Sequence, residues 1–219
     1  MVEDKTTWSQ SFFDEVEPIK TRDPLSYILG AQADETPSYF YYTDAIKMAG
    51  HSCPAVSSAY RITQLALAAL YDTETPTRGE VRVLIKGGAR DLAYGPQAQV
   101  ISLITGASGE TGFKGLGGGR FGRNDKLKFD ALDPQFCTYI FQREDTGETV
   151  KVVYDPSALG ADTGISPIMP LVMNGTATAE QVKLFRALWQ GKVRSILLEN
   201  DKFPGLFTVE SVEGFTWPS

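Results

Sequence analysis

The sequence has 219 residues, of which 42% are hydrophobic and 22% are charged. These proportions are those of a globular protein, and the length suits one domain with extensions. The net charge of −6 argues against a nucleic-acid partner, because nucleic acids select basic surfaces. No segment has the run of apolar residues that a membrane span needs. Two cysteines are too few for a disulfide framework, so we expect a reducing, cytoplasmic location.

The first 43 residues are predicted to form an N-terminal extension. Residues 1–22 are polar with scattered aromatic side chains, and we expect them to dock on the body as an arm. Asp23-Pro24 places an N-cap residue before a proline at the first helical position, which predicts a short helix ending at Gly30. A polar loop over 31–38 and the aromatic cluster Tyr39–Tyr42 complete the extension.

A predicted core follows over residues 44–155 and begins with two helices. Thr43-Asp44 caps a short helix over 45–49 that ends at Gly50. Pro54 then starts a long helix through Tyr71, in which apolar residues recur at helical spacing. The junction between the two helices, Ala49-Gly50-His51-Ser52-Cys53-Pro54, contains the single histidine and one of the two cysteines.

That junction is the strongest candidate site in the sequence. In an extended segment, residues two apart point to the same side of the backbone, so His51 and Cys53 are expected to share one space. A thiolate at a helix N-terminus is stabilised by the helix dipole and by free N–H groups. The pair therefore predicts either two ligands of a metal site or an activated thiol. A histidine and a cysteine that are merely packed and hydrogen-bonded are the ordinary alternative.

The rest of the core is predicted as strand, helix and three strands. Alternating residues over 80–86 predict a half-buried strand, and Pro96 starts a helix that runs to Thr105. The three later strands are expected at Leu127–Phe129, Phe136–Gln142 and Thr149–Tyr154. Cys137, in the middle strand, is expected to pack in the core.

A glycine-rich stretch over 106–122 separates that helix from the three strands. It holds eight glycines, with Lys114 and Arg120 between them. Bare N–H groups in such a run can bind an anion, but the stretch matches neither phosphate-binding glycine pattern. We therefore prefer the interpretation that this stretch is a mobile loop over a site to the interpretation that it binds a nucleotide.

Residues 156–219 are predicted to pack on the core as a C-terminal helix and tail. Thr178 and Gln181 form a capping box that starts a strongly amphipathic helix. Its apolar stripe is long enough to cover the core or to meet a second copy of the chain, so we expect a homodimer. The aromatic tail over 203–219 is expected to pack down as a strand or strap.

The sequence resembles a known family at its central junction. Gly50-His51-Ser52-Cys53-Pro54, followed by a small-residue helix carrying Tyr60-Arg61, resembles the H-G-H-x-C-P-G signature of the FmdE-like family of formylmethanofuran dehydrogenase proteins. Leu103–Gly109 is similar to that family's Thr-Gly-Cys-Thr-x-Gly segment, and Asp125-Lys126 extends the likeness. The resemblance covers about residues 44–155. It implies an α+β fold, a mixed β-sheet with helices on one face, whose order of helix, strand, helix and three strands is also the order that periodicity predicts.

The resemblance favours metal binding as the first hypothesis. His51 and Cys53 would supply an imidazole and a thiolate, a set that suits zinc and also iron, nickel or copper. The family implies further cysteine ligands in the second motif, but Pro96 and Ala107 stand where they would fall. The site would have to be completed by an oxygen donor (Asp91, Tyr94 or Asp125), by a cofactor or by a second copy of the chain.

Two other hypotheses need no metal. In the first, the protein is an enzyme that uses Cys53 as nucleophile or redox thiol with His51 as its proton partner. Lys114, Arg120 or Lys126 would then bind an anionic small-molecule substrate, and Arg61 is a further candidate through the family match. In the second, the protein is a non-catalytic or accessory protein whose pocket holds an organic cofactor.

Overall fold

The computed structural model describes residues 6–33 and 35–218, so predictions for residues 1–5 of the extension lie outside the described residues. The helices are α1 (Pro24–Ile28), α2 (Tyr42–Ala49), α3 (Pro54–Tyr71), α4 (Tyr94–Thr105), α5 (Met169–Met173) and α6 (Ala179–Leu198). The strands are β1 (Ile19–Thr21), β2 (Ser38–Phe40), β3 (Val81–Ile85), β4 (Leu127–Phe129), β5 (Thr138–Arg143), β6 (Thr149–Tyr154) and β7 (Phe207–Ser211). None of these helices could cross a membrane.

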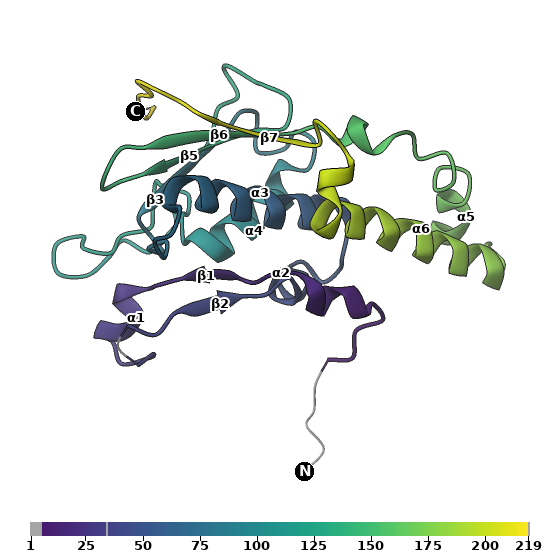
Figure 1. Ribbon diagram of the computed structural model, residues 1–219, viewed down its shortest axis with the longest axis horizontal. Coiled ribbons are helices and arrows are strands. Elements are labelled where there is room, and N and C mark those ends of the chain that lie inside the picture. The colour runs from purple at the N-terminus through teal and green to yellow at the C-terminus, as the bar shows by residue number, and fades with distance from the viewer. Residues whose placement is uncertain (1–5, 34, 219) are drawn as a thin grey trace, which may run out of the picture.

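A five-stranded sheet forms one layer of the molecule, in the order β4-β3-β5-β6-β7. The β3–β4 pair is parallel and the other pairs are antiparallel, so the sheet is mixed and the predicted α+β class is confirmed. Helices α3 and α4 lie against one face of this sheet, and the two-stranded β1–β2 ribbon lies on the far side of these helices (Figure 1). The buried core fills the space between the sheet and α3, with Val83, Phe141 and Val152 fully covered.

Strands β1 and β2 were not predicted, because each pairs with a segment that is distant in the sequence. Strand β2 covers part of the predicted aromatic cluster and pairs with β1, which contributes residues from the expected polar arm. Strand β7 lies in the tail that was expected to form a strand or strap, and it extends the core sheet along β6. The strand expected from Phe136 begins two residues later, because Cys137 has a positive φ of 42° that ends extended geometry there.

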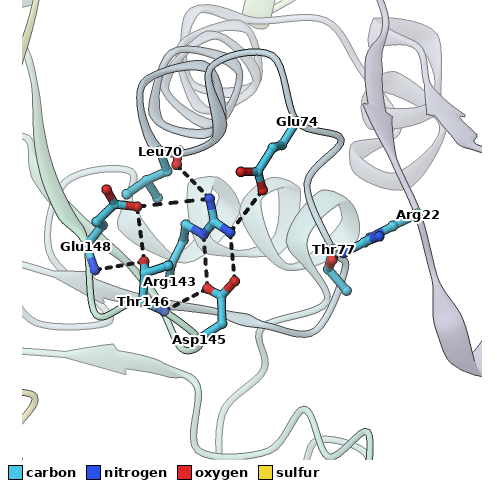
Figure 2. A network of polar contacts seen from close by, with 8 residues as sticks. All are labelled: Arg22, Leu70, Glu74, Thr77, Arg143, Asp145, Thr146 and Glu148. Atoms are coloured by element: carbon cyan, nitrogen blue, oxygen red, sulfur yellow. Dashed lines mark hydrogen bonds and ion pairs between the residues drawn. The ribbon is translucent and has the colours of Figure 1, made fainter.

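The last turn of α3 is joined to the β5–β6 hairpin by one arginine. Figure 2 shows the guanidinium of Arg143 held by both oxygens of Asp145, at 3.0 and 2.7 Å, and donating to the carbonyl of Leu70 at 3.1 Å. The same group contacts Glu74 at 3.2 Å and stacks over the ring of Tyr71 at 4.0 Å. Because the arginine side chain is only 8% exposed and holds several partners at once, it fixes the helix end relative to the sheet.

Candidate functional site

The junction between α2 and α3 has the predicted local structure. Helix α2 ends at Gly50, whose φ of 77° is the left-handed value that glycine adopts without a steric penalty. Cys53 is the N-cap of α3, and Pro54 takes the first helical position. The Cys53 thiol accepts a hydrogen bond from the backbone N–H of Val56 at 3.5 Å, so its sulfur lies at the positive end of the helix.

His51 and Cys53 have different surroundings in this junction. The Cys53 side chain is 8% exposed and belongs to the hydrophobic core, whereas His51 is exposed. The imidazole Nδ1 lies 2.9 Å from the carbonyl of Ala49, and since a carbonyl only accepts, Nδ1 carries the proton. In the neutral form of the ring, Nε2 then carries the lone pair that a metal ligand needs. His51 lies in a bend, so the rule for extended residues two apart does not apply here.

Ser52, between the two candidate residues, is held by helix α6. Its hydroxyl lies 2.9 Å from that of Tyr42 and donates to the side chain of Gln190 at 3.1 Å. Its carbonyl accepts from the indole N–H of Trp189 at 3.0 Å. Burial raises the pKa of Tyr42 above its usual value, which keeps this phenol protonated as a donor. The amphipathic C-terminal helix therefore positions the junction, a role that its own pattern does not indicate.

A closed metal site is not formed by the described residues. They contain no group of three or more histidine, cysteine, aspartate or glutamate side chains that could hold an ion. Ala107, at one expected cysteine position, is fully buried, and Pro96, at the other, lies on α4. Since structural zinc takes four ligands and catalytic zinc at least three, one chain does not fit a family-type site.

The other predicted site residues do not gather at the junction. Lys126 is occupied by the Glu144 carboxylate and by the carbonyl of Gly79 at 2.5 Å. Arg61 donates to the Gln64 side chain on its own helix, and burial lowers its pKa. Lys114 and Arg120 are exposed in the glycine-rich loop, where Arg120 lies over the ring of Phe121. In the part of the chain that the structure describes, no hydrogen bond or ion pair joins these four to His51 or Cys53.

The second cysteine is packed in the core, as its sequence context predicts. Cys137 is 7% exposed, and its backbone N–H donates to the Tyr94 hydroxyl at 2.8 Å. Burial raises the pKa of the Cys137 thiol to about 11, so the thiol is protonated at neutral pH. Cys137 is therefore a structural residue.

The glycine-rich loop borders a cavity of about 940 Å³ between itself and α4. The loop is fixed at its base, where the N–H of Arg123 donates to the carbonyl of Phe113 at 2.7 Å and its carbonyl accepts from Ser108. The cavity walls combine apolar side chains with a few polar ones; they include Met48, Ala98, Leu103, Phe113, Leu127 and Phe129 together with Gln99, Ser102, Ser108 and Thr111. Neither His51 nor Cys53 lines this cavity, so the site that the loop borders is not the α2–α3 junction.

Two arginines that the sequence did not single out lie at this cavity. Arg78 comes from the loop before β3 and Arg123 from the end of the glycine-rich stretch, and both pair with Asp23. Their separation in the chain hides the pair, and the only sequence signal is the Asp-Pro cap that places Asp23 at the start of α1.

Comparison with known proteins gives two findings. The family model described as "FmdE, Molybdenum formylmethanofuran dehydrogenase operon" matches residues 48–203. A crystal structure of a tungsten formylmethanofuran dehydrogenase FmdE-like protein from Syntrophus aciditrophicus is 15% identical, with a TM-score of 0.41. The alignment covers 79% of this chain and 72% of that chain. No curated protein matches the sequence.

Proposed function

Because the chain belongs to the FmdE family, whose model spans residues 48–203, we propose that it is a family member that binds a small organic molecule. The binding site is the cavity between α4 and the glycine-rich loop. This is the cofactor-binding function that the sequence suggested, but its proposed site is this cavity and not the His51–Cys53 junction. The observation that carries the proposal is the cavity itself, whose walls include Leu103, Gly106, Ser108 and Gly109 of the second family-like segment.

The composition of the cavity supports this role. Ligand pockets generally measure about 300–1,000 Å³ and combine apolar walls with a few convergent polar groups. The volume of about 940 Å³, the aromatic rings of Phe113 and Phe129, and the hydroxyls of Ser102 and Ser108 match that description. The junction offers one exposed imidazole and one buried thiol, which by themselves do not hold a ligand.

A cavity-filling variant tests the proposal. Ser102→Trp places an indole in the cavity from α4, and we expect it to abolish binding of the uncharged fluorescent probe N-phenylnaphthylamine. Ser211→Trp is the matched control, since Ser211 is exposed on β7 at the opposite edge of the sheet from β4. Wild type that binds no probe, or equal probe binding by wild type and Ser102→Trp, would exclude the cavity as a binding site.

Metal binding at His51 is the second candidate function. The hydrogen bond from Nδ1 to Ala49 leaves Nε2 with its lone pair, which is how metal-bound histidines are commonly oriented. We propose zinc first, then iron, nickel or copper, with the missing ligands supplied by Cys53 and a second copy of the chain. Elemental analysis of wild type, His51→Ala and Cys53→Ala tests this: a metal lost in His51→Ala supports coordination. Metal-free protein with a reactive Cys53 would favour the thiol-enzyme hypothesis instead.

We also propose that the chain forms a homodimer through α6 and α5. Val193, Ile196 and Leu197, in the C-terminal half of α6, are buried in the core. The N-terminal half extends away from the body with α5 beside it (Figure 1). Leu184 and Met173 on this arm are 49% and 65% exposed, which a symmetric partner would cover.

For location, we propose the reducing cytoplasm. Both cysteines are free and buried, and each stands alone in its part of the core rather than in a disulfide. That is the usual state of cysteine in cytoplasmic proteins.

A further inference from the structure

The cavity between α4 and the glycine-rich loop carries positive charge. Among the described residues that line it, the charged ones are Arg78 and Arg123. This sign is opposite to the net charge of −6 that the whole sequence carries. The two side chains are only 20% and 13% exposed, so their charges are poorly screened by solvent.

Both guanidinium groups share one carboxylate oxygen. Nη2 of Arg123 lies 2.6 Å from Oδ2 of Asp23, and Nη1 of Arg78 lies 3.2 Å from the same atom. The Asp23 side chain is 10% exposed. Two cations and one anion leave this little-exposed cluster with an excess positive charge. Mutual repulsion and lost hydration make that excess unfavourable until a second anion joins the cluster.

Arg123 has donors left for such an anion. Among the described residues, Asp23 is the hydrogen-bond partner of its guanidinium, through Nη2 alone. Its Nε and Nη1 lie beside Gly79 and Gly106, where an added Cβ would come within 3.5 and 3.1 Å of them. The two glycines therefore place no side chain of their own against these nitrogens. The Nη2 of Arg78, by contrast, donates to the carbonyl of Leu103 at 3.1 Å, near the C-terminus of α4.

We propose that Arg123, supported by Arg78, binds the carboxylate or phosphate group of a small molecule in this cavity. The apolar body of that molecule lies against Phe113, Leu127 and Phe129. The inference rests on the proposed function and adds the ligand's chemical class. A planar guanidinium with free donors matches a carboxylate or phosphate oxygen pair in both charge and geometry.

Two fluorescent probes with the same aromatic body separate the anion from the cavity. Anilinonaphthalene sulfonate carries an oxyanion, and N-phenylnaphthylamine lacks it. We expect wild type to bind the anionic probe about tenfold or more tightly than the neutral one, the size of one good charged hydrogen bond. Competition by octanoate, octyl phosphate and octanol then ranks carboxylate against phosphate, with the alcohol as the uncharged reference.

Arg123→Met should remove the preference for the anionic probe and leave binding of the neutral probe unchanged. The variant keeps Asp23 paired with Arg78, so the cluster becomes balanced and the protein is expected to stay folded. Arg120→Met is the matched control, because it removes the same charge from an exposed site outside this cavity. Thermal melting of each variant excludes unfolding as the cause.

The outcomes distinguish the two levels of the proposal. Equal binding of both probes by wild type, or a preference that survives in Arg123→Met, overturns the anion site while leaving the cavity proposal intact. Binding of neither probe, or neutral-probe binding that Ser102→Trp leaves unchanged, overturns the cavity itself.

Discussion

Arg143 and Asp23 are both little exposed, and each lies at the centre of a charge cluster. Negative charge is in excess around Arg143, and positive charge is in excess around Asp23. Arg143 is one cation among three carboxylates, of Glu74, Asp145 and Glu148, which are 48% to 65% exposed and therefore hydrated. Asp23 is one anion between two arginines that are mostly covered. An excess of charge is tolerated where water reaches it, which makes the Arg143 cluster structural. The excess at Asp23 lies on side chains that are only 10% to 20% exposed, and this is the physical basis for expecting a ligand there.

Arg143→Met is expected to lower the free energy of unfolding by about 2 kcal/mol, since it removes charged hydrogen bonds and the packing on Tyr71. Lys151→Met, which breaks a more exposed ion pair with Glu210, should cost less than about 1 kcal/mol. Urea unfolding at neutral pH measures both. A loss in Lys151→Met as large as that in Arg143→Met would contradict the structural role of Arg143.

The stability difference between wild type and Arg143→Met has a predicted pH dependence. The Arg143 guanidinium holds the pKa of Asp145 below its ordinary value. The pair therefore stabilises the folded state above the unfolded pKa of about 3.9, and this contribution is lost as pH falls through the lowered folded pKa. We expect the stability gap between the two proteins to narrow below about pH 4. A gap that stays constant under acid would show that the charge of Asp145 is not involved.

At the scale of elements, local signals predicted most of the fold. Helical spacing and caps located α3 and α6, and alternation located β3, because these signals lie within one segment. The β1–β2 ribbon depends on pairing between distant residues, so no local pattern predicted it, and the tail pattern did not show which strand β7 would pair with. The candidate site residues were likewise predicted only where they are close together in the sequence. The α2–α3 junction was predicted from adjacent residues, whereas Arg78 and Arg123 meet Asp23 only through the tertiary fold.

The buried residues of helix α6 lie in its C-terminal half, so its N-terminal half depends more on the helix cap. The Thr178 hydroxyl accepts from the N–H of Gln181 at 3.2 Å, and the Gln181 side chain accepts from the N–H of Thr178 at 2.8 Å. The first turns contribute no buried residue, so this box is their main local support.

Thr178→Ala should cost about 1 kcal/mol locally, with faster amide hydrogen exchange over residues 179–184 and little change in the global melting temperature. Thr178→Ser retains the capping oxygen and should exchange like wild type. Slow exchange in Thr178→Ala would mean that contacts other than the cap hold this end of the helix.

At the scale of the whole molecule, the arm formed by α5 and the N-terminal half of α6 exposes apolar side chains, which the proposed dimer would bury. The helix needs tertiary packing to be stable, yet Leu184 in its N-terminal half stays 49% exposed although α5 contacts the helix. The arm also adjoins the junction, because Trp189 and Gln190 hold Ser52. A partner docked on the arm would therefore lie near His51, where the second candidate function needs ligands from outside the chain.

Sedimentation equilibrium should give wild type twice the chain mass of 24.0 kDa. Introducing two charges into the apolar contact, with Met173→Glu and Leu184→Glu together, should return the protein to the mass of one chain, because each buried carboxylate would lack a partner. Circular dichroism should be unchanged, since both side chains are exposed within the single chain. Leu132→Glu is the control: this residue is 98% exposed in the loop between β4 and β5, and its variant should remain a dimer. A monomeric wild type, or dissociation of Leu132→Glu, would contradict the arm as the dimer contact. If the dimer also completes the metal site, the double variant loses any metal that wild type binds, whereas Leu132→Glu keeps it.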